Sequence, residues 1–229
     1  MSNTFKITVR NQSNSLQQYA LFNKVPKVIG NVQEQIWSNV FAIDKAANRQ
    51  DISFEVTNEY FAIVGKKKKN ASGSVTITVT GTEPVILGAT EDNGQPIPGT
   101  SLSMFVANQT PQFDTTSLPN KSFPNAYEIR TGEFSNSEAK NGGYLIGLGA
   151  KGGSDGPAAT FVPESRMSYQ IQPANTYYVA VGEFKMGQLI DVTKIGEVCP
   201  VDFTKLPSEV LIVHDDKGGL TVQVGFTEN

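Results

Sequence analysis

With 229 residues, 38% of them hydrophobic, the chain is long enough to enclose an apolar core without disulfide bonds or a structural metal. A net charge of −3 argues against a protein whose main partner is the phosphate backbone of nucleic acid. The single cysteine, Cys199, excludes an internal disulfide; no apolar run reaches the length of a membrane span, and the amino terminus lacks an export signal. These features predict a soluble, cytoplasmic protein.

From the amino terminus onward, alternating polar and apolar side chains predict half-buried β-strands. Phe5, Ile7 and Val9 alternate with polar residues in the first of these segments. The same alternation recurs in four later segments, residues 52–57, 75–80, 167–172 and 220–224. Strands in the middle of a sheet are predicted where both faces are apolar. Such segments span residues 60–64, 85–87, 144–146, 177–181 and 210–213.

Turn-forming residues separate these segments at the spacing of antiparallel strands. The clearest hairpin runs from Tyr60 through a loop of Lys, Asn and Gly to Val79, and a second joins Val210 to Val224. Helical periodicity is scarce, and residues 135–140 and 203–210 can hold single helical turns at most. The predicted fold is all-β, an antiparallel two-sheet sandwich of jelly-roll type with few or no helices.

We expect one sandwich domain over residues 1–229. The alternative rests on residues 107–125, a polar segment with three prolines that is either a crossover between sheets or a linker. A linker there would leave two abutting sandwiches, residues 1–107 and 125–229.

Three segments carry a resemblance to known proteins: NQSNSLQQYALFNKVPKV at residues 11–28, QIWSNVF at 35–41 and NTYYV at 175–179. In these segments the chain resembles a group of uncharacterised β-rich proteins of filamentous fungi. The group has no known activity, so the resemblance implies no function for this chain.

Two motifs can each be interpreted in two ways, as a catalytic or cofactor site or as a structural element. Residues 147–152 read G-x-G-x-x-G, typical of a dinucleotide site when a helix follows, but the glycine-rich continuation favours a loop or tight hairpin. His214 precedes Asp215 and Asp216, a combination found at metal sites and general bases, yet the three residues lie in a predicted hairpin turn. We expect the structural role in both cases.

No metal or cofactor is predicted. Cys199 is expected to be a buried structural thiol, and one Cys with one His cannot make a zinc site within the chain. The loop aspartates lack the regular spacing of a calcium loop.

A run of four lysines, Lys66, Lys67, Lys68 and Lys69, is predicted at the tip of the first hairpin. Such a run either binds an anion such as sulfate, phosphate or a lipid headgroup, or keeps the hairpin soluble and unpaired, and we favour the second role. For a ligand site we expect loop oxygens and backbone groups with an aromatic platform. The candidate residues are Trp37, Asp92, Asn93, Asp155, Asp215 and Asp216.

Three functions remain open on this sequence. The favoured one is a non-catalytic, lectin-like protein that binds a carbohydrate or similar polar ligand through loops at the ends of the sandwich. The second is a structural protein that assembles with its own copies through strand edges. The third is an isomerase or cyclase that holds an apolar small molecule in a β-lined cavity.

Overall fold

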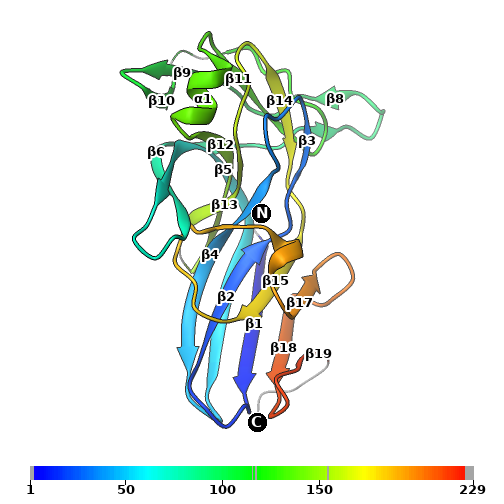
Figure 1. Cartoon of the computed structure of the whole chain (residues 1–229). Helices are drawn as coiled ribbons and strands as arrows, with labels where there is room; N and C mark the ends of the chain where they lie inside the picture. The colour runs from blue at the N-terminus through cyan, green and yellow to red at the C-terminus, as the bar shows by residue number, and fades with distance from the viewer. Residues whose placement is uncertain (1–2, 115, 117, 154, 225–229) are drawn as a thin grey trace.

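The computed structural model describes residues 3–114, 116, 118–153 and 155–224, and nearly all its regular structure is β (Figure 1). Among these residues there is one short helix, α1 (Asn136–Asn141), and one 3₁₀ turn, η1 (Val192–Lys194). The prediction of an all-β chain with few helices is confirmed. No described helix combines the length and the apolar character needed to cross a membrane.

Twelve strands form the larger sheet, in the order β17-β15-β2-β4-β13-β12-β5-β1-β18-β19, with β16 beside β4 and β6 beside β5. Their bounds are β1 (Thr4–Asn11), β2 (Gln17–Asn23), β4 (Trp37–Ala46), β5 (Asp51–Lys69), β6 (Val75–Val85), β12 (Tyr144–Gly152), β13 (Gly156–Phe161), β15 (Thr176–Val181), β16 (Leu189–Ile190), β17 (Val198–Asp202), β18 (Glu209–His214) and β19 (Leu220–Gln223).

A smaller sheet of five strands lies at one end of the larger sheet, at the top of Figure 1. Its strands, in spatial order, are β10 (Thr110–Phe113), β9 (Ser101–Ala107), β11 (Tyr127–Thr131), β14 (Ser168–Gln172) and β3 (Lys27–Ile29). A separate short hairpin joins β7 (Ala89–Thr90) to β8 (Pro96–Ile97).

The larger sheet curls until its two ends meet. β17 packs against β19, and the N–H of Leu220 donates a hydrogen bond of 3.4 Å to the Glu197 carboxylate. Strand twist accumulates across a wide sheet and turns its ends toward each other. The expected two-sheet sandwich is therefore corrected to a nearly closed, barrel-like sheet that carries a smaller sheet.

Two strand pairs also depart from the antiparallel expectation. β1 runs parallel to β18, with Val9 opposite Ile212, and β11 runs parallel to β9. The other pairs of named strands are antiparallel. The β1–β18 pair joins the first strand of the chain to one of the last, a partnership that alternation of side chains does not specify.

Strand β5 explains how the β5–β6 hairpin comes to project from the curled sheet. Over its first part β5 pairs with β1, and over its last part the same edge pairs with β6. β12 occupies its other edge. The hairpin therefore continues past β1 and stands away from the body of the sheet, at the left of Figure 1.

Large aromatic and aliphatic side chains fill the interior. Tyr19, Phe41 and Phe161 of the larger sheet are buried, and the same apolar cluster continues through Tyr127 and Tyr169 of the smaller sheet. The strands of the smaller sheet come from both sides of residues 107–125, and this segment itself contains β10. The division into one or two domains remains a prediction.

Most predicted strands are confirmed. Residues 85–87 are the exception, because Val85 alone lies in a strand. The helical turn expected at 135–140 corresponds to α1, whereas 203–210 contains turns and the start of β18.

Candidate functional site

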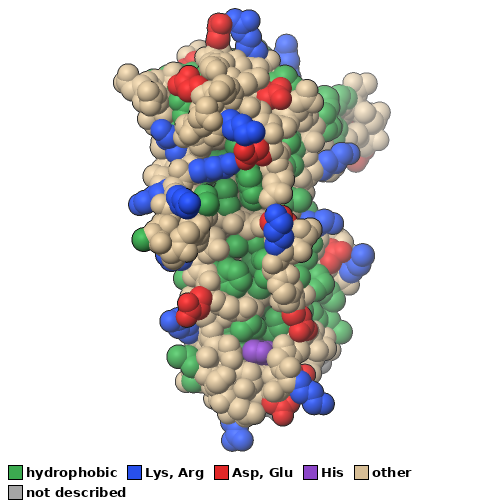
Figure 2. Space-filling view, in the orientation of Figure 1, with side chains coloured by type: hydrophobic (Ala, Val, Ile, Leu, Met, Phe, Trp, Pro, Cys, Tyr) green, Lys and Arg blue, Asp and Glu red, His purple; other side chains and the backbone are tan. Residues whose placement is uncertain are grey.

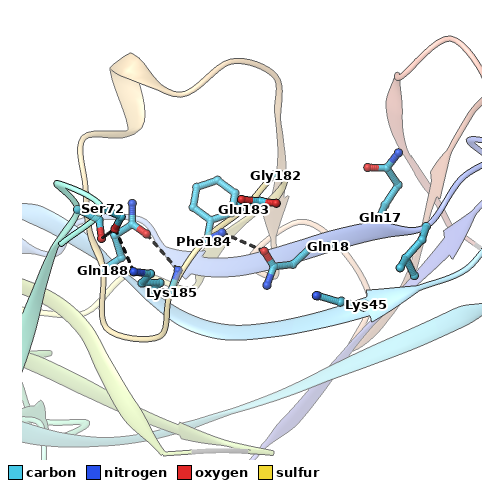
Figure 3. A pocket seen from close by; sticks show the side chains of 11 residues that line it. Gln17, Gln18, Lys45, Ser72, Gly182, Glu183, Phe184, Lys185 and Gln188 are labelled. Carbon is cyan, nitrogen blue, oxygen red and sulfur yellow. Dashed lines mark hydrogen bonds between the residues drawn. The ribbon is translucent and has the colours of Figure 1, made fainter. Parts of the chain in front are cut away.

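A hollow of about 640 Å³, lined by polar and apolar atoms in nearly equal measure, lies where the β5–β6 turn approaches the loop after β15 (Figure 3). We call it the Gln18 pocket. Strands β2 and β4, the turn and the loop supply its lining residues: Leu16, Gln17, Gln18, Lys45, Ser72, Ser74, Gly182, Glu183, Phe184, Lys185 and Gln188. Its volume lies within the range of small-molecule sites, about 300–1,000 Å³.

Gln18 fixes one end of the 182–188 loop. Its backbone carbonyl accepts a hydrogen bond from the N–H of Gly182 at 3.0 Å, and its side-chain carbonyl accepts one from the N–H of Phe184 at 3.0 Å. Gly182 has φ of +148°, a conformation that favours glycine. The loop therefore leaves β15 in a direction that brings Phe184 over β2.

The other end of the loop is fixed to β4 and to the β5–β6 hairpin. The N–H of Gly187 donates to Val40, and its carbonyl accepts from Ile77. The ammonium of Lys185 donates to the hydroxyl of Ser72 at 3.0 Å, and the N–H of Lys185 donates to the side-chain carbonyl of Gln188 at 3.1 Å. These bonds hold the two walls of the pocket together.

Part of the hydrogen-bonding capacity of the two glutamines is not used within the described residues. Gln18 and Gln188 each use the side-chain oxygen within the chain, while the side-chain NH₂ groups have no partner among the described residues. An amide NH₂ carries two donors. The pocket therefore combines free amide donors, the hydroxyls of Ser72 and Ser74, and the ring of Phe184.

Three charged side chains complete the lining. Lys45 extends from β4 directly opposite Gln18 in the strand register, and Lys185 and Glu183 extend from the loop. Neither lysine forms an ion pair with a described carboxylate.

The predicted ligand residues lie elsewhere and do not converge. Asp92 and Asn93 occupy the exposed turn between β7 and β8, where Asn93 accepts a hydrogen bond from the N–H of Gln95. Asp215 and Asp216 form the β18–β19 turn, and two backbone N–H groups that bind the Asp215 carboxylate lower its pKa. Asp155 borders another hollow. Their assignment as ligand residues remains a prediction.

The hollow at Asp155 is a second, smaller candidate of about 400 Å³ with a largely apolar lining. Phe61, Val79, Pro84 and Pro157 are the hydrophobic residues of its lining. Its one carboxylate is Asp155, and Lys151 on the rim is paired with Glu59 at 3.1 Å. This hollow is the place that the isomerase hypothesis would use.

Trp37 is half-buried at the start of β4, and Lys67 covers its ring. The Lys67 ammonium lies 4.1 Å from the ring centroid and 2.5 Å from the Glu34 carboxylate. A ring in contact with a cation offers less surface for stacking by a ligand. The platform role of Trp37 remains a prediction.

The lysine run lies within β5, and the hairpin turn is formed by the residues that follow it, 70–74. Lys66 and Lys67 are half-buried; the Lys66 ammonium donates to the carbonyl of Gln109 at 3.0 Å. Lys68 and Lys69 are exposed. Figure 2 shows basic side chains gathered at mid-height on the left, the position of the β5–β6 hairpin in Figure 1.

The remaining motifs lie in strands of the larger sheet. His214 is buried and bonded to Tyr19, and burial lowers its pKa. The Cys199 thiol is buried, as expected, which raises its pKa to about 11. Residues 147–152 belong to the largely buried strand β12 and lead toward β13, not into the helix that a dinucleotide site requires. They form one arm of the antiparallel β12–β13 hairpin, so of the two predicted structures the tight hairpin is confirmed.

No group of three or more potential metal ligands occurs in the described part of the chain. The residues that sequence reasoning missed are Gln18, Lys45, Phe184, Lys185 and Gln188. One local signal points to the last three: two glycines, Gly182 and Gly187, enclose a short loop with two hydrophobic and two charged residues directly after an apolar strand.

A sequence model of one protein family, described as RhiA, matches residues 2–225 of this chain. The match spans both sheets and every residue that lines the Gln18 pocket. No curated protein and no solved structure matches the chain.

Proposed function

The chain belongs to the RhiA family, and we propose that it is a non-catalytic binding protein. Its Gln18 pocket would hold a carbohydrate or similar polyhydroxylated ligand. The observation that carries the proposal is the pair of free amide NH₂ groups, from Gln18 and Gln188, in one pocket with Phe184. Both glutamines are held by bonds through their oxygens, so the free donors are oriented before a ligand arrives.

The chemistry of the lining suits sugars. A sugar hydroxyl both donates and accepts, and the pocket offers amide donors together with the hydroxyls of Ser72 and Ser74. The apolar C–H face of a pyranose packs against an aromatic ring, a role that Phe184 can fill. The volume of about 640 Å³ has room for a mono- or disaccharide.

Two finer statements belong to this proposal. We place the protein in the cytoplasm, a choice supported by its single, buried cysteine. A relationship to the β-rich proteins of filamentous fungi, suggested by residues 11–28, 35–41 and 175–179, is likewise a proposal.

A glycan array followed by calorimetry with the best sugars tests the function. The informative variant is Gln18→Glu, which keeps the acceptor for the Phe184 N–H and removes the free NH₂ donor. We expect it to weaken binding at least about tenfold, since an unmade hydrogen bond in a binding site costs roughly that much. Gln95→Glu, on the exposed β7–β8 turn, is the matched control. Absence of sugar binding at millimolar concentration would remove the proposal.

A second candidate function, association with further copies of the chain, is favoured by one apolar patch. Ile86 (76% exposed), Ile97 (47%) and Phe123 (51%) are unusually exposed for large hydrophobic residues. Their backbones are neighbours. A Cβ on Gly88 would lie 2.4 Å from the carbonyl oxygen of Phe123 and 3.1 Å from that of Ile97, and a Cβ on Gly99 would lie 2.3 Å from that of Ile86. Sedimentation of the wild type and of Ile86→Ser tests this role; a monomer throughout the micromolar range would contradict it.

A further inference from the structure

The charges that line the Gln18 pocket go beyond the needs of a neutral sugar. Lys45 and Lys185 come from different walls, and neither has a carboxylate partner among the described residues. Figure 3 shows the Gln18 side chain between them. Two ammonium groups without carboxylate partners that line one hollow favour an anionic ligand.

The placement of the two lysines follows from the fold. Lys45 pairs with Gln18 across β2 and β4, so their side chains stand next to each other on the same face. The neighbouring Asp44 is directed to the opposite face by strand alternation and is not part of the pocket. Lys185 is held at the other wall by its hydrogen bond to Ser72.

The surroundings add to the positive potential. Lys68 and Lys69 are exposed on β5 just before the turn that supplies Ser72 and Ser74. The chain as a whole carries a net charge of −3, so this concentration of basic groups is local. A local positive field raises the concentration of anions near the pocket.

Glu183 favours an acidic sugar over an inorganic anion as the ligand of the pocket. It is the one carboxylate in the lining, and it would repel an inorganic anion that fills the pocket. A carboxylate is, however, a strong acceptor for hydroxyl groups. A ligand with one acidic group and several hydroxyls satisfies both lysines and Glu183.

We propose that the Gln18 pocket selects anionic sugars, with the carboxylate or phosphate of the ligand between Lys45 and Lys185 and its hydroxyls at Gln18 and Glu183. This inference rests on the proposed function and makes it specific. The acid group and the hydroxyls would then be recognised by different residues, so they can be tested separately.

The experiment is calorimetry at low salt with glucose, glucuronate and glucose 6-phosphate. We expect each acidic sugar to bind at least about tenfold more tightly than its neutral counterpart, the gain from one or two charge-assisted hydrogen bonds. The preference for carboxylate or phosphate identifies the acid group. Added salt should reduce this advantage.

Two variants test whether the pocket lysines cause the preference for acidic sugars. Lys45→Met and Lys185→Met should each weaken the binding of acidic sugars several-fold more than the binding of neutral sugars, so the preference for acidic sugars falls. Lys24→Met, an exposed lysine outside the pocket, is the matched control, and thermal melts confirm that the variants fold.

The outcomes separate the two proposals. If neutral sugars bind as tightly as acidic ones, or if the lysine variants weaken both classes equally, the selection for anions is wrong and the sugar-binding function stands. If neither class binds at millimolar concentration, both proposals fall.

Discussion

The hydroxyl of Tyr19 lies 2.8 Å from Nδ1 of His214, and this contact connects β2 to β18 inside the larger sheet. Along the sheet these strands are separated by β4, β13, β12, β5 and β1, and only the curl brings them face to face. Both side chains are buried, and their rings pack edge to face at 5.7 Å. The pair therefore reports on closure of the sheet.

Tyr19→Phe keeps the ring and removes the hydrogen bond. We expect the free energy of unfolding to fall by about 1–2 kcal/mol, because the buried His214 nitrogen is left without a partner. Denaturant unfolding measures the change. Tyr178→Phe, whose half-buried hydroxyl has no partner among the described residues, should change stability by less than about 0.5 kcal/mol. Equal effects of the two substitutions would contradict the role of the pair.

Stability should depend on pH through His214. Burial lowers its folded-state pKa, an effect larger than the opposing attraction of Asp215 and Glu197. In the unfolded chain the pKa is about 6.5. Below that pH the unfolded state binds a proton that the folded state resists, so stability is full above about pH 6.5 and falls as the pH drops.

The denaturation midpoint should accordingly decrease between pH 7.5 and 5.5 in the wild type, and His214→Gln should lose most of this dependence. Carboxylates with lowered pKa, such as Glu128 and Asp215, titrate below this window. The same slope in both proteins would show that another group is responsible.

Gly147 is required by packing between β12 and β13. A Cβ at this position would lie 2.1 Å from the backbone oxygen of Ala159, and backbone cannot move aside cheaply. We expect Gly147→Ala to lower the free energy of unfolding by about 2 kcal/mol or more. Gly153→Ala is the control, since a Cβ there meets nothing within 4 Å. Two substitutions of similar cost would refute the packing argument.

Lys67 should stabilise the protein and shield Trp37. Removing its contacts with the ring and with Glu34 in Lys67→Met is expected to cost about 1 kcal/mol. Trp37 is the only tryptophan, so acrylamide quenching of fluorescence reports on it alone and should increase. Lys69→Met, on the exposed end of β5, should leave both quantities unchanged. Unaltered quenching in Lys67→Met would contradict the contact.

The sequence allowed the strands to be predicted better than their partners. Alternation at Phe5, Ile7 and Val9 identifies a strand and its buried face, and the Lys-Asn-Gly segment after Tyr60 predicts the β5–β6 hairpin. Alternation says nothing about which strand lies alongside. Alternation therefore does not predict the parallel β1–β18 pair or the contact of β17 with β19. Without these two contacts, the predicted fold is a sandwich.

The candidate site was harder to predict for a related reason. Gln18, Lys45, Ser72 and Lys185 come from four separate segments, and only the register of β2 with β4 and the docking of the hairpin on the loop bring them together. Asp92 and Asp215 are predicted as ligand residues because polar loop side chains are typical of binding sites, but the same residue types also favour turns. In the structure these side chains mainly bind neighbouring backbone or face water.

The most direct test of the central claim is an NMR titration of ¹⁵N-labelled protein with glucuronate and, separately, glucose. If the Gln18 pocket binds sugars, shifts should concentrate in the side-chain NH₂ signals of Gln18 and Gln188 and in the backbone signals of residues 182–188, and glucuronate should produce them at lower concentration. Shifts confined to other surfaces, such as the turns at Asp92 or Asp215, or no shifts at millimolar sugar, would contradict the account.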